Sequence, residues 1–513
     1  MAWSLLFLCA PSMALKISLL LALLLATKAA AEVDLRALVK EHRLDNGMVW
    51  LIVERSQAPV FTGFIRVKVG GADEVPGYTG LAHLFEHMAF KGTPVLGAQD
   101  FEAEKKLLVQ VADVGDKLAA LERAGKDQTD EAKLLRKRLA ELGEASSKIT
   151  DENALAALYQ LNGAVGLNAT TDKDLTSYFV SLPRNRLEMW AVTEASRLAS
   201  PVLRDFYKER DVVLEERRMR TDSEPGGAVY EELNQVAFTM SPYRWPTVGY
   251  TEDLQAMTLK SAQDFHRKFY APANAVGCIV GDVKFDEVVK LLERTFGKIP
   301  ARPPPPPLLF TEPPKRQQRR STVFFDASPR LYMAFKKPTL PTREDYIFDV
   351  INILLGEGRT ARLHRRLVLK EKTAQFAGTF GAPGSRLDNL FIVGVIPLAG
   401  AKVEALEKSI WEELERLKTE PVSAKDLQKV RNQLTADVAR SVDSNAGLAD
   451  NLSRYQALAG DWRYSADHAK VIETITPEDI QRVAKTFFVA ENSVIVDLKK
   501  PATTAAVKTG GAK

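Results

Sequence analysis

The chain has 513 residues, of which 45% are hydrophobic and 27% are charged, and its formal net charge is +4. This composition is ordinary for a soluble globular protein with two or more domains. It excludes collagen-like, disordered and multi-span membrane proteins. Because the charge is nearly balanced, it does not indicate a nucleic acid or a strongly acidic molecule as partner.

The first 31 residues are typical of a secretory signal peptide. An apolar run from Ile17 to Ala26 follows Lys16, and Ala29-Ala30-Ala31 makes a small-residue cleavage site. The alternative is an uncleaved membrane anchor, but the run is shorter than the roughly 20 apolar residues that a span requires. We therefore predict a signal peptide over residues 1–31, no stable membrane span after its cleavage, and a periplasmic or secreted protein.

The mature chain would keep a single cysteine, Cys278, because Cys9 lies in the leader. No intrachain disulfide is then possible, and packing alone has to stabilise the fold. Cys278 lies in the apolar run from Ala275 to Val280, which favours an inert residue of a buried strand over a nucleophile.

Hydrophobic periodicity divides the chain into strands and helices. In the first half we expect strands at 49–53, 62–69 and 166–171. In the second half we expect strands at 331–335 and 390–396 and helices at 345–355 and 402–418. Strands that interleave with helices indicate a mixed α/β (α+β) fold in both halves.

The segment His83-Leu84-Phe85-Glu86-His87 has the spacing of a zinc site, in the inverse order of the commoner H-E-x-x-H motif. Residues four apart share one face of an α-helix, so His83 and His87 can bind one metal ion while Glu86 lies alongside. Zinc lowers the pKa of a bound water to about 7, and a neighbouring carboxylate can take its proton. The alternative is a helix with two surface histidines, but the apolar neighbours indicate burial, where unliganded histidines are costly.

A charged stretch from Phe101 to Leu161 carries leucines at helical spacing and is interrupted near residues 125–129. This pattern predicts an antiparallel two-helix hairpin inserted into the first half. Two roles fit it: an arm that grips a partner chain, or a solvated excursion packed on its own domain.

A catalytic zinc ion needs a third protein ligand and an open position for water. Glu209 and Glu216 lie seven residues apart, which places them on the same side of a helix. Glu216 is the candidate third ligand, and Glu209 is a candidate for a hydrogen bond to a ligand or to the metal-bound water. Pairing with neighbouring arginines on a solvated surface also explains both residues, and periodicity alone does not decide.

Five consecutive prolines, Pro303 to Pro307, mark an extended linker that we place at 301–320. The sequences on either side resemble each other, because Thr258 to Val276 and Thr476 to Val494 share a pattern at a constant offset of 218. Each copy is predicted to be a helix that runs into a strand. A duplicated domain explains the repeat.

Three segments together resemble the successive signatures of the pitrilysin, insulinase and mitochondrial-processing-peptidase family of zinc metallopeptidases. They are residues 80–93 with the H-x-x-E-H motif, Asn168-Ala169-Thr170-Thr171, and Glu209 to Glu216. The resemblance implies that His83, His87 and Glu216 bind one zinc ion per chain. It also implies that Glu86 is the general base and that Glu209 is a supporting residue.

The resemblance further implies a fold and a mode of substrate binding. Family members contain homologous α/β domains, each with a mixed sheet of about six strands flanked by helices. Two such halves pair as a clamshell around an enclosed chamber, which favours short or unfolded polypeptides. Substrates lie extended along an edge strand, here 166–171, where Asn168 and Ala169 would contact substrate main chain by strand addition.

We therefore expect a bacterial secreted member of the two-domain form. Its zinc-peptidase domain would span 32–300 with the hairpin at 101–161, and a homologous non-catalytic domain would span 321–500. Residues 501–513 would be a disordered tail.

The second half departs from the family pattern. Family enzymes place an arginine and a tyrosine, seven residues apart, where they bind substrate and stabilise the oxyanion. At these positions this chain has Val368 or Leu369 and Gln375 or Phe376. We expect a heterodimer whose sister chain supplies the arginine and tyrosine, with a homodimer as the alternative. A non-catalytic assembly or binding subunit that retains the fold is the rival function, although every proposed ligand and the base are present.

Overall fold

The computed structural model of the chain describes residues 35–314 and 317–501. The predicted signal peptide and residues 502–513 of the predicted tail lie outside the described residues, so both remain predictions. The chain divides into two compact units, Met1–Val39 and Lys40–Lys513. The described part of the first unit contains helix α2 (Leu35–Leu38). Among the described helices, none is long and apolar enough to cross a membrane.

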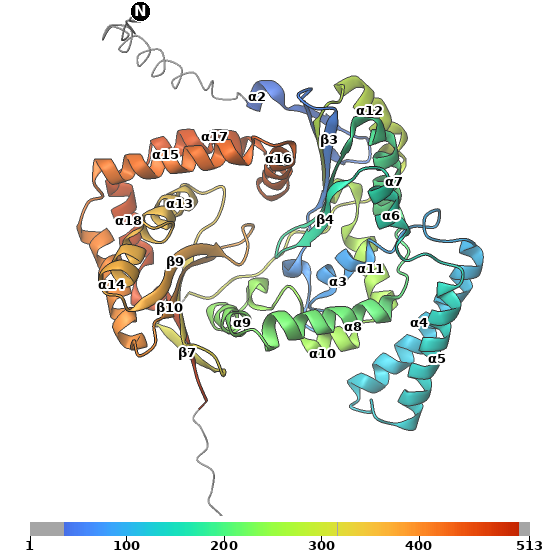
Figure 1. The fold of residues 1–513 in the computed structure, drawn as a ribbon, viewed down its shortest axis with the longest axis horizontal. Helices are drawn as coiled ribbons and strands as arrows, with labels where there is room; N and C mark the ends of the chain where they lie inside the picture. The colour runs from blue at the N-terminus through green and yellow to red at the C-terminus, as the bar shows by residue number, and fades with distance from the viewer. Residues whose placement is uncertain (1–34, 315–316, 502–513) are drawn as a thin grey trace, which may run out of the picture. The chain divides into compact units, whose positions relative to one another are not determined.

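The second unit contains two mixed sheets (Figure 1). The first sheet has the strand order β1 (Lys40–Arg43), β2 (Val49–Glu54), β6 (Ala275–Gly281), β3 (Val60–Val67), β5 (Thr176–Pro183) and β4 (Val165–Thr171). Strands β2 and β6 pair in parallel, and the other neighbours pair antiparallel. The strands expected at 49–53, 62–69 and 166–171 are all present, and β4 lies at an edge.

The second sheet repeats this arrangement. Its order is β7 (Arg319–Phe324), β11 (Ser493–Lys499), β8 (Arg330–Lys337), β10 (Asn389–Pro397) and β9 (Ala374–Ala382). Again one pair is parallel, here β7 with β11, and the other neighbours pair antiparallel. No described strand corresponds to β1, so this sheet has five strands where the resemblance implies about six. The shared topology confirms the prediction of two homologous mixed-sheet units.

The repeat at offset 218 has the same structure in both copies. Helix α11 (Leu259–Phe269) begins at Thr258 and helix α18 (Pro477–Phe487) begins at Thr476, and both threonines accept a bond from the third backbone N–H of the helix. After each helix an asparagine amide donates to a carbonyl at the helix end, Asn274 to Phe269 and Asn492 to Phe487. The sequence pattern was detectable because these caps require particular side chains at fixed positions.

Helices cover the faces of both sheets. In the first half they are α3 (Leu81–Met88), α4 (Phe101–Arg123), α5 (Asp130–Ser147), α6 (Ala154–Leu161), α7 (Leu187–Ala199), α8 (Phe206–Arg217), α9 (Pro225–Ala237), α10 (Thr251–Ala256), α11 and α12 (Phe285–Arg294). In the second half they are α13 (Arg343–Leu355), α14 (Val403–Thr419), α15 (Ala424–Ser441), α16 (Asn445–Ala459), α17 (Arg463–Glu473) and α18. The helices expected at 345–355 and 402–418 correspond to α13 and α14.

Each half places one helix on the other half's sheet. Helix α9 packs against β7, β8 and β11, and helix α16 packs against β3 and β6. The apolar cluster beneath α9 joins Val229 and Leu233 to Val494 and Val496 of β11. Beneath α16, buried Arg66 of β3 binds Asp450 at 2.5 Å. This exchange ties the two halves together by both packing and charge.

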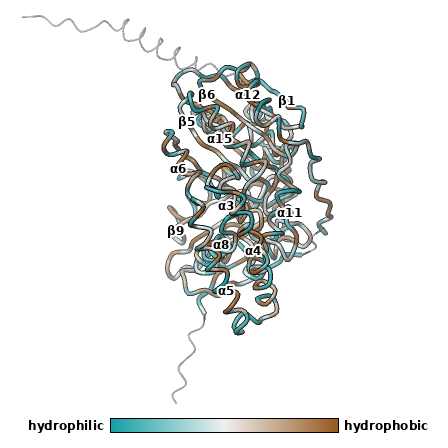
Figure 2. Tube along the Cα trace, turned by 90° about the vertical axis from the view of Figure 1, so that its right-hand side faces the viewer, coloured by the Kyte–Doolittle hydropathy of each residue, from teal (hydrophilic) through white to brown (hydrophobic). Residues whose placement is uncertain are grey.

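The predicted hairpin is present, but it is shorter than expected (Figure 1). Helices α4 and α5 pack against each other, and the break falls at 124–129. Hydrophilic and hydrophobic residues mix along this part of the chain in Figure 2, as in an amphipathic hairpin. The expected stretch to Leu161 was too long, because α6 is a separate helix whose Leu155 and Tyr159 are buried in the main core.

The proline tract contains no helix or strand, as expected of an extended linker. The linker placed at 301–320 overlaps the second sheet by two residues, because β7 begins at Arg319. The guanidinium of Arg319 donates to the carbonyl of Val236 on α9 at 2.9 Å. The basic end of the predicted linker is therefore a strand that α9 holds in place.

Candidate metal centre

Helix α3 carries the H-x-x-E-H motif and is anchored by its apolar side chains. Leu81, Leu84, Phe85 and Met88 are buried in the core of the first half. The face that carries the motif turns toward α8 and β4, which both contact α3. The spacing of these residues thus buries one side of the helix and directs the histidines to the other.

Glu74 fixes the N-terminus of α3, where Gly80 has no side chain to act as a cap. One carboxylate oxygen of Glu74 accepts the Gly80 N–H at 2.9 Å and the other accepts the Ala82 N–H at 2.7 Å. A carboxylate at a helix N-terminus satisfies free N–H groups and interacts favourably with the helix dipole. Burial raises the pKa of Glu74 to about 8, although these two hydrogen bonds oppose the shift. Sequence reasoning missed Glu74, since it lies six residues before the helix end it caps.

Helix α8 supplies the two carboxylates. Phe206, Tyr207 and Val213 are buried in the core, which holds the helix against α3. Glu209 and Glu216 lie two turns apart and both face the histidines. The sequence prediction that they share one face therefore agrees with the structure.

His83, His87 and Glu216 come together, with their ligand atoms all within 4.8 Å of one another. One oxygen of Glu216, Oε2, lies 3.6 Å from Nε2 of His83 and 3.5 Å from Nε2 of His87. Atoms that bind zinc tetrahedrally at about 2.0–2.1 Å lie roughly 3.3 Å apart. Two imidazoles and one carboxylate at this separation fit a zinc ion that keeps one position open for water.

The surrounding charges orient these groups. Nδ1 of His87 lies 3.4 Å from Glu209, and the other oxygen of Glu209 lies 2.6 Å from Nζ of Lys91. The hydrogen bond to Glu209 raises the pKa of His87 to about 9, whereas burial lowers the pKa of His83 to about 4. The second oxygen of Glu216 pairs with Arg220 at 2.6 Å, on the π-helical turn that continues α8. Glu209 thus fixes the ring of His87 with Nε2 directed at the metal position.

Glu86 lies on the same helix between the two histidines. It is partly exposed, and burial of the rest of its side chain raises its pKa. A hydrogen bond to Thr171, the last residue of β4, opposes this shift. A carboxylate whose pKa is raised toward neutrality is better matched to accepting a proton from a metal-bound water.

The edge strand β4 lies beside the motif helix, with Asn168 exposed and Ala169 buried. Asn168 pairs with Phe179 and Ala169 with Tyr178 of β5, which leaves the outer edge of β4 without a described partner strand. Because Ala169 as a whole residue is only 6% exposed, its side chain can contribute little to the binding of an extended peptide.

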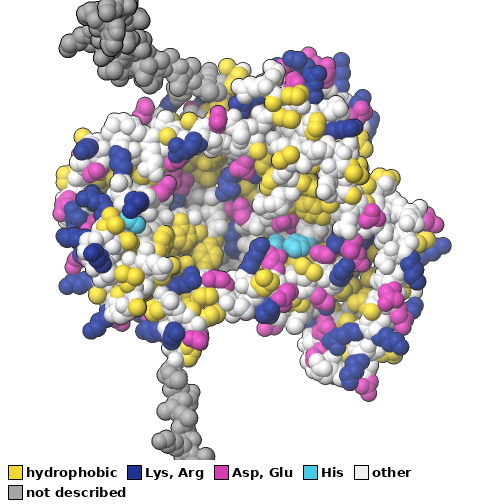
Figure 3. Space-filling model, viewed as in Figure 1, with side chains coloured by type: hydrophobic (Ala, Val, Ile, Leu, Met, Phe, Trp, Pro, Cys, Tyr) yellow, Lys and Arg dark blue, Asp and Glu magenta, His cyan; other side chains and the backbone are white. Residues whose placement is uncertain are grey.

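The site is accessible from outside. The side chains of His87 and Glu216 are 24% and 17% exposed. Figure 3 shows histidine side chains open to view in the middle of one face, beside acidic and basic groups.

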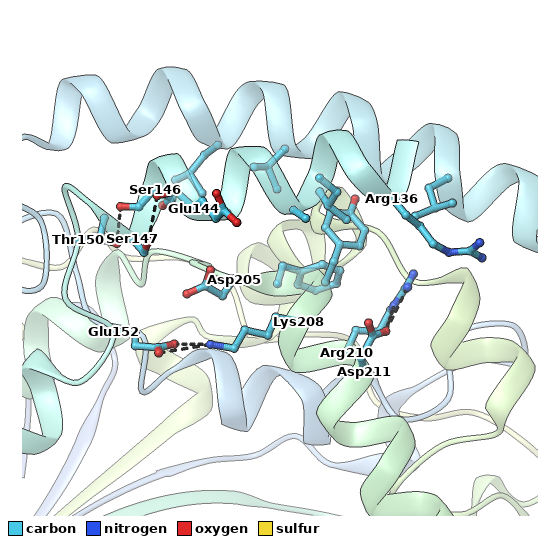
Figure 4. Close-up of a pocket in the computed structure, with 18 of the residues that line it drawn as sticks. Arg136, Glu144, Ser146, Ser147, Thr150, Glu152, Asp205, Lys208, Arg210 and Asp211 are labelled. Carbon is cyan, nitrogen blue, oxygen red and sulfur yellow. Dashed lines mark hydrogen bonds and ion pairs between the residues drawn. The ribbon is translucent and has the colours of Figure 1, made fainter. Parts of the chain in front are cut away.

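The hairpin packs on the opposite side of α8 from the metal position. A cavity of about 930 Å³ lies between the hairpin and α8 (Figure 4). At this cavity Lys208, adjacent to Glu209, pairs with Glu152 at 3.1 Å. The hydroxyl of Tyr207 on α8 donates to Asp116 of the hairpin at 3.0 Å. These contacts favour an excursion packed on its own domain over a free arm.

Comparisons with known proteins identify relatives of this chain. A family model described as insulinase (peptidase family M16) matches residues 51–108, and one described as peptidase M16 inactive domain matches residues 256–434. Zinc protease PqqE of Helicobacter pylori is 28% identical over 451 residues, which are 85% of this chain and 88% of that protein. The chain belongs to the pitrilysin/insulinase family.

Solved structures of family members share the fold. The crystal structure of a protease from Helicobacter pylori aligns with a TM-score of 0.76 and 26% identity, over 90% of this chain and 99% of that chain. A peptidase M16 inactive domain from Pseudomonas fluorescens aligns with a TM-score of 0.73 at 17% identity, over 91% of this chain and 99% of that one. The resemblance to this family is therefore confirmed, and so is its two-sheet α/β fold.

Where family members place an arginine and a tyrosine, the second half of this chain has Val368 or Leu369 and Gln375 or Phe376. Residues 364–370 form a π-helical segment, and Phe376 on β9 is 52% exposed. Residues 362–376, the stretch in which the family places these two side chains, contain no tyrosine.

Proposed function

We propose that this member of the M16 zinc protease family is an active zinc-dependent metalloendopeptidase. The observation that carries the proposal is the convergence of His83, His87 and Glu216 to a tetrahedral spacing beside Glu86. Bound zinc would polarise the scissile carbonyl and lower the pKa of a water ligand to about 7. Relatives named zinc proteases support the assignment.

Residues of this chain would have three separate roles in peptide hydrolysis. Glu86 accepts the proton of the attacking water and returns it to the leaving amine. Glu209 keeps Nε2 of His87 directed at the metal position. The free edge of β4 binds the substrate main chain, which demands extended or unfolded segments and little particular sequence.

We further propose that a partner chain completes the site inside an enclosed chamber. This chain lacks the expected arginine and tyrosine, and losing one oxyanion donor typically costs about a hundredfold or more in rate. A sister chain that supplies both residues explains why the metal site is intact while the second half is degenerate. Mixing the purified chain with candidate sister chains tests this, because full activity of the lone chain, unchanged by any partner, would contradict it.

The location of the enzyme is part of the proposal. The leader at residues 1–31 supports export to the periplasm or beyond. Western blotting of cell fractions should detect the mature chain outside the cytoplasm, and an uncleaved cytoplasmic product would contradict export.

The rival function is a non-catalytic subunit that retains the family fold. The absent arginine and tyrosine favour it, while the complete metal-binding set opposes it. Glu86→Gln separates the two functions, because the change preserves the metal ligands and removes the base. We expect peptidase activity to fall by about 10²- to 10⁴-fold with zinc content unchanged. Equal activity of the variant and the parent would refute the proposed mechanism.

A further inference from the structure

A second polar cavity lies in the helical layer of the second half. It has a volume of about 520 Å³ and opens between the end of α13, the segment 360–371, α14 and α15. These helices pack on the face of β8 that presents Leu331, Met333 and Phe335, whereas α9 covers the opposite face. The cavity is therefore separate from the metal centre, which α3 and α8 build in the first half.

Positive charge predominates around this cavity. Its basic lining residues are Arg362, Arg365, Arg366, Lys370, Arg416 and Lys429, and its acidic ones are Glu371, Glu413 and Asp426. Arg366 and Arg416 use Glu371 and Glu413 in ion pairs of 2.6–3.3 Å. Within the part of the chain that the structure describes, Arg362, Arg365 and Lys370 form no ion pair.

Arg362 is the most informative of these residues. Its Nη1 atom is buried and has no hydrogen-bond partner among the described residues. Burial, followed by the nearby guanidinium of Arg416, lowers the pKa of Arg362, and the carboxylates of Glu413, Asp426 and Glu420 oppose this shift. A buried donor without a partner is energetically costly, more so when it is charged, and usually indicates a bound ion, ligand or water.

The shape and chemistry of the cavity restrict what it can hold. Apolar lining is limited to Ile353, Leu354 and Val430. Guanidinium groups suit oxyanions because their planar N–H fork matches phosphate or carboxylate oxygens. A phosphate group offers about two negative charges and three acceptor oxygens, which matches three cations without partners. The volume falls in the range of small-molecule sites, about 300–1,000 Å³.

We propose that this cavity binds a phosphate-bearing ligand, with Arg362 donating to the phosphate oxygens and Lys370 and Arg365 supplying further charge. The site is independent of the proposed peptidase activity. The phosphate group can belong to a free small molecule or to a phospholipid headgroup, and the two sources call for separate measurements.

Isothermal titration calorimetry of the zinc-loaded full chain with pyrophosphate, at constant ionic strength, tests the site. We expect saturable binding to one site per chain. Arg362→Gln should weaken it at least tenfold. Lys370 is exposed, so Lys370→Gln should fold normally and also weaken binding, which keeps the test decisive if Arg362→Gln is unstable. Arg186→Gln is the matched control, since Arg186 is exposed in the first half and has no ion pair among the described residues.

Sedimentation with phosphatidic acid vesicles, against phosphatidylcholine vesicles, supplies the second arm. Sedimentation that depends on Arg362 assigns the headgroup as ligand, and pyrophosphate binding without sedimentation assigns a free phosphate compound. The proposal is overturned if neither probe binds. It is also overturned if Arg186→Gln weakens binding as much as Arg362→Gln. The same holds if Arg362→Gln and Lys370→Gln both bind pyrophosphate like the parent, because pyrophosphate would then be binding elsewhere, for example to the zinc ion.

Discussion

The contact between Glu209 and His87 would orient a proposed metal ligand from outside the ligand set. Their contact at 3.4 Å orients the imidazole, and Lys91 at 2.6 Å keeps the carboxylate charged and in place. Burial alone would raise the pKa of Glu209, but the hydrogen bond to His87, followed by that to Lys91, lowers it to about 2. Glu209 therefore stays ionised at any pH at which zinc can compete with protons for the imidazoles.

Replacement of this carboxylate should weaken metal binding. We predict that Glu209→Gln lowers zinc affinity by about 10- to 100-fold, because a neutral amide is a weaker acceptor for the ring of His87 and no longer pairs with Lys91. Competition with a chromogenic chelator measures the affinity. Glu215→Gln is the control on the same helix, since Glu215 pairs only with exposed Arg218. Equal affinities of Glu209→Gln and the control would show that the contact does not orient the ligand.

The ligand set was predictable from the sequence to different degrees. His83, Glu86 and His87 lie within one helical turn, so their spacing alone fixes their geometry. Glu216 is 129 residues beyond His87, and only the family resemblance singled it out from its neighbours. Glu74 and Lys91 carry no such pattern, because their roles arise from contacts that only the folded chain creates.

At the level of elements, a fully buried ion pair helps to anchor the hairpin to the rest of the first half. Arg204 and Glu104 have fully buried side chains 2.5 Å apart. Arg204 also donates to the carbonyls of Lys91, Thr93 and Leu96, in the loop that follows the motif helix. The insertion is thus coupled to the segment that carries Lys91 and through it to Glu209.

Breaking this pair should destabilise the protein. We predict that Arg204→Ala lowers the free energy of unfolding by about 3–5 kcal/mol, because it leaves the charge of Glu104 buried and unpaired. Urea denaturation followed by circular dichroism measures the change. Lys133→Ala removes an exposed pair on the same hairpin and should change stability by less than about 0.5 kcal/mol. A small effect of Arg204→Ala would mean that the hairpin does not depend on this anchor.

The end of the proline linker supplies a pH-dependent contact. Glu312 accepts the backbone N–H groups of Thr239, Met240 and Ser241 at 2.7–2.8 Å and pairs with Lys336 at 2.9 Å. Burial would raise the pKa of Glu312, but these hydrogen bonds outweigh it and lower the pKa to about 2. A carboxyl whose pKa is lower in the folded chain stabilises the fold above its unfolded pKa, which is about 4.5.

The lowered pKa of Glu312 predicts that its contribution to stability depends on pH. We predict that Glu312→Gln lowers the free energy of unfolding by about 1–2 kcal/mol at pH 7, since a neutral amide accepts these bonds more weakly. The difference from the parent should shrink as the pH falls from about 4.5 to about 2, where Glu312 becomes protonated. Thermal unfolding across this range measures it. A difference that stays constant with pH would show that the charge of Glu312 does not matter.

For the whole molecule, the duplication can be predicted from the sequence, whereas the exchange of helices between the two halves cannot. The offset of 218 survives because Thr258 and Thr476, like Asn274 and Asn492, make the same capping bonds in both copies. Helices α9 and α16 show only ordinary amphipathic patterns. A periodicity tells which face of a helix is buried, but it does not tell which sheet buries it.

The departures from prediction also have physical reasons. The hairpin is shorter than the predicted stretch because α6 is a separate helix whose Leu155 and Tyr159 are buried in the core of the first half. The linker overlapped β7 because Arg319 and Arg320 read as solvated charges, whereas α9 and Glu407 bind them in the structure.

We propose that His83, His87 and Glu216 hold one zinc ion, and the zinc content of Glu216→Ala decides whether they do. Inductively coupled plasma mass spectrometry should find about one zinc per parent chain, as expected of a site with three protein ligands and an open position. After dialysis at a zinc concentration that saturates the parent, the variant should retain less than about a tenth of that zinc. Full zinc content in Glu216→Ala, or a parent chain that binds no zinc, would contradict the account.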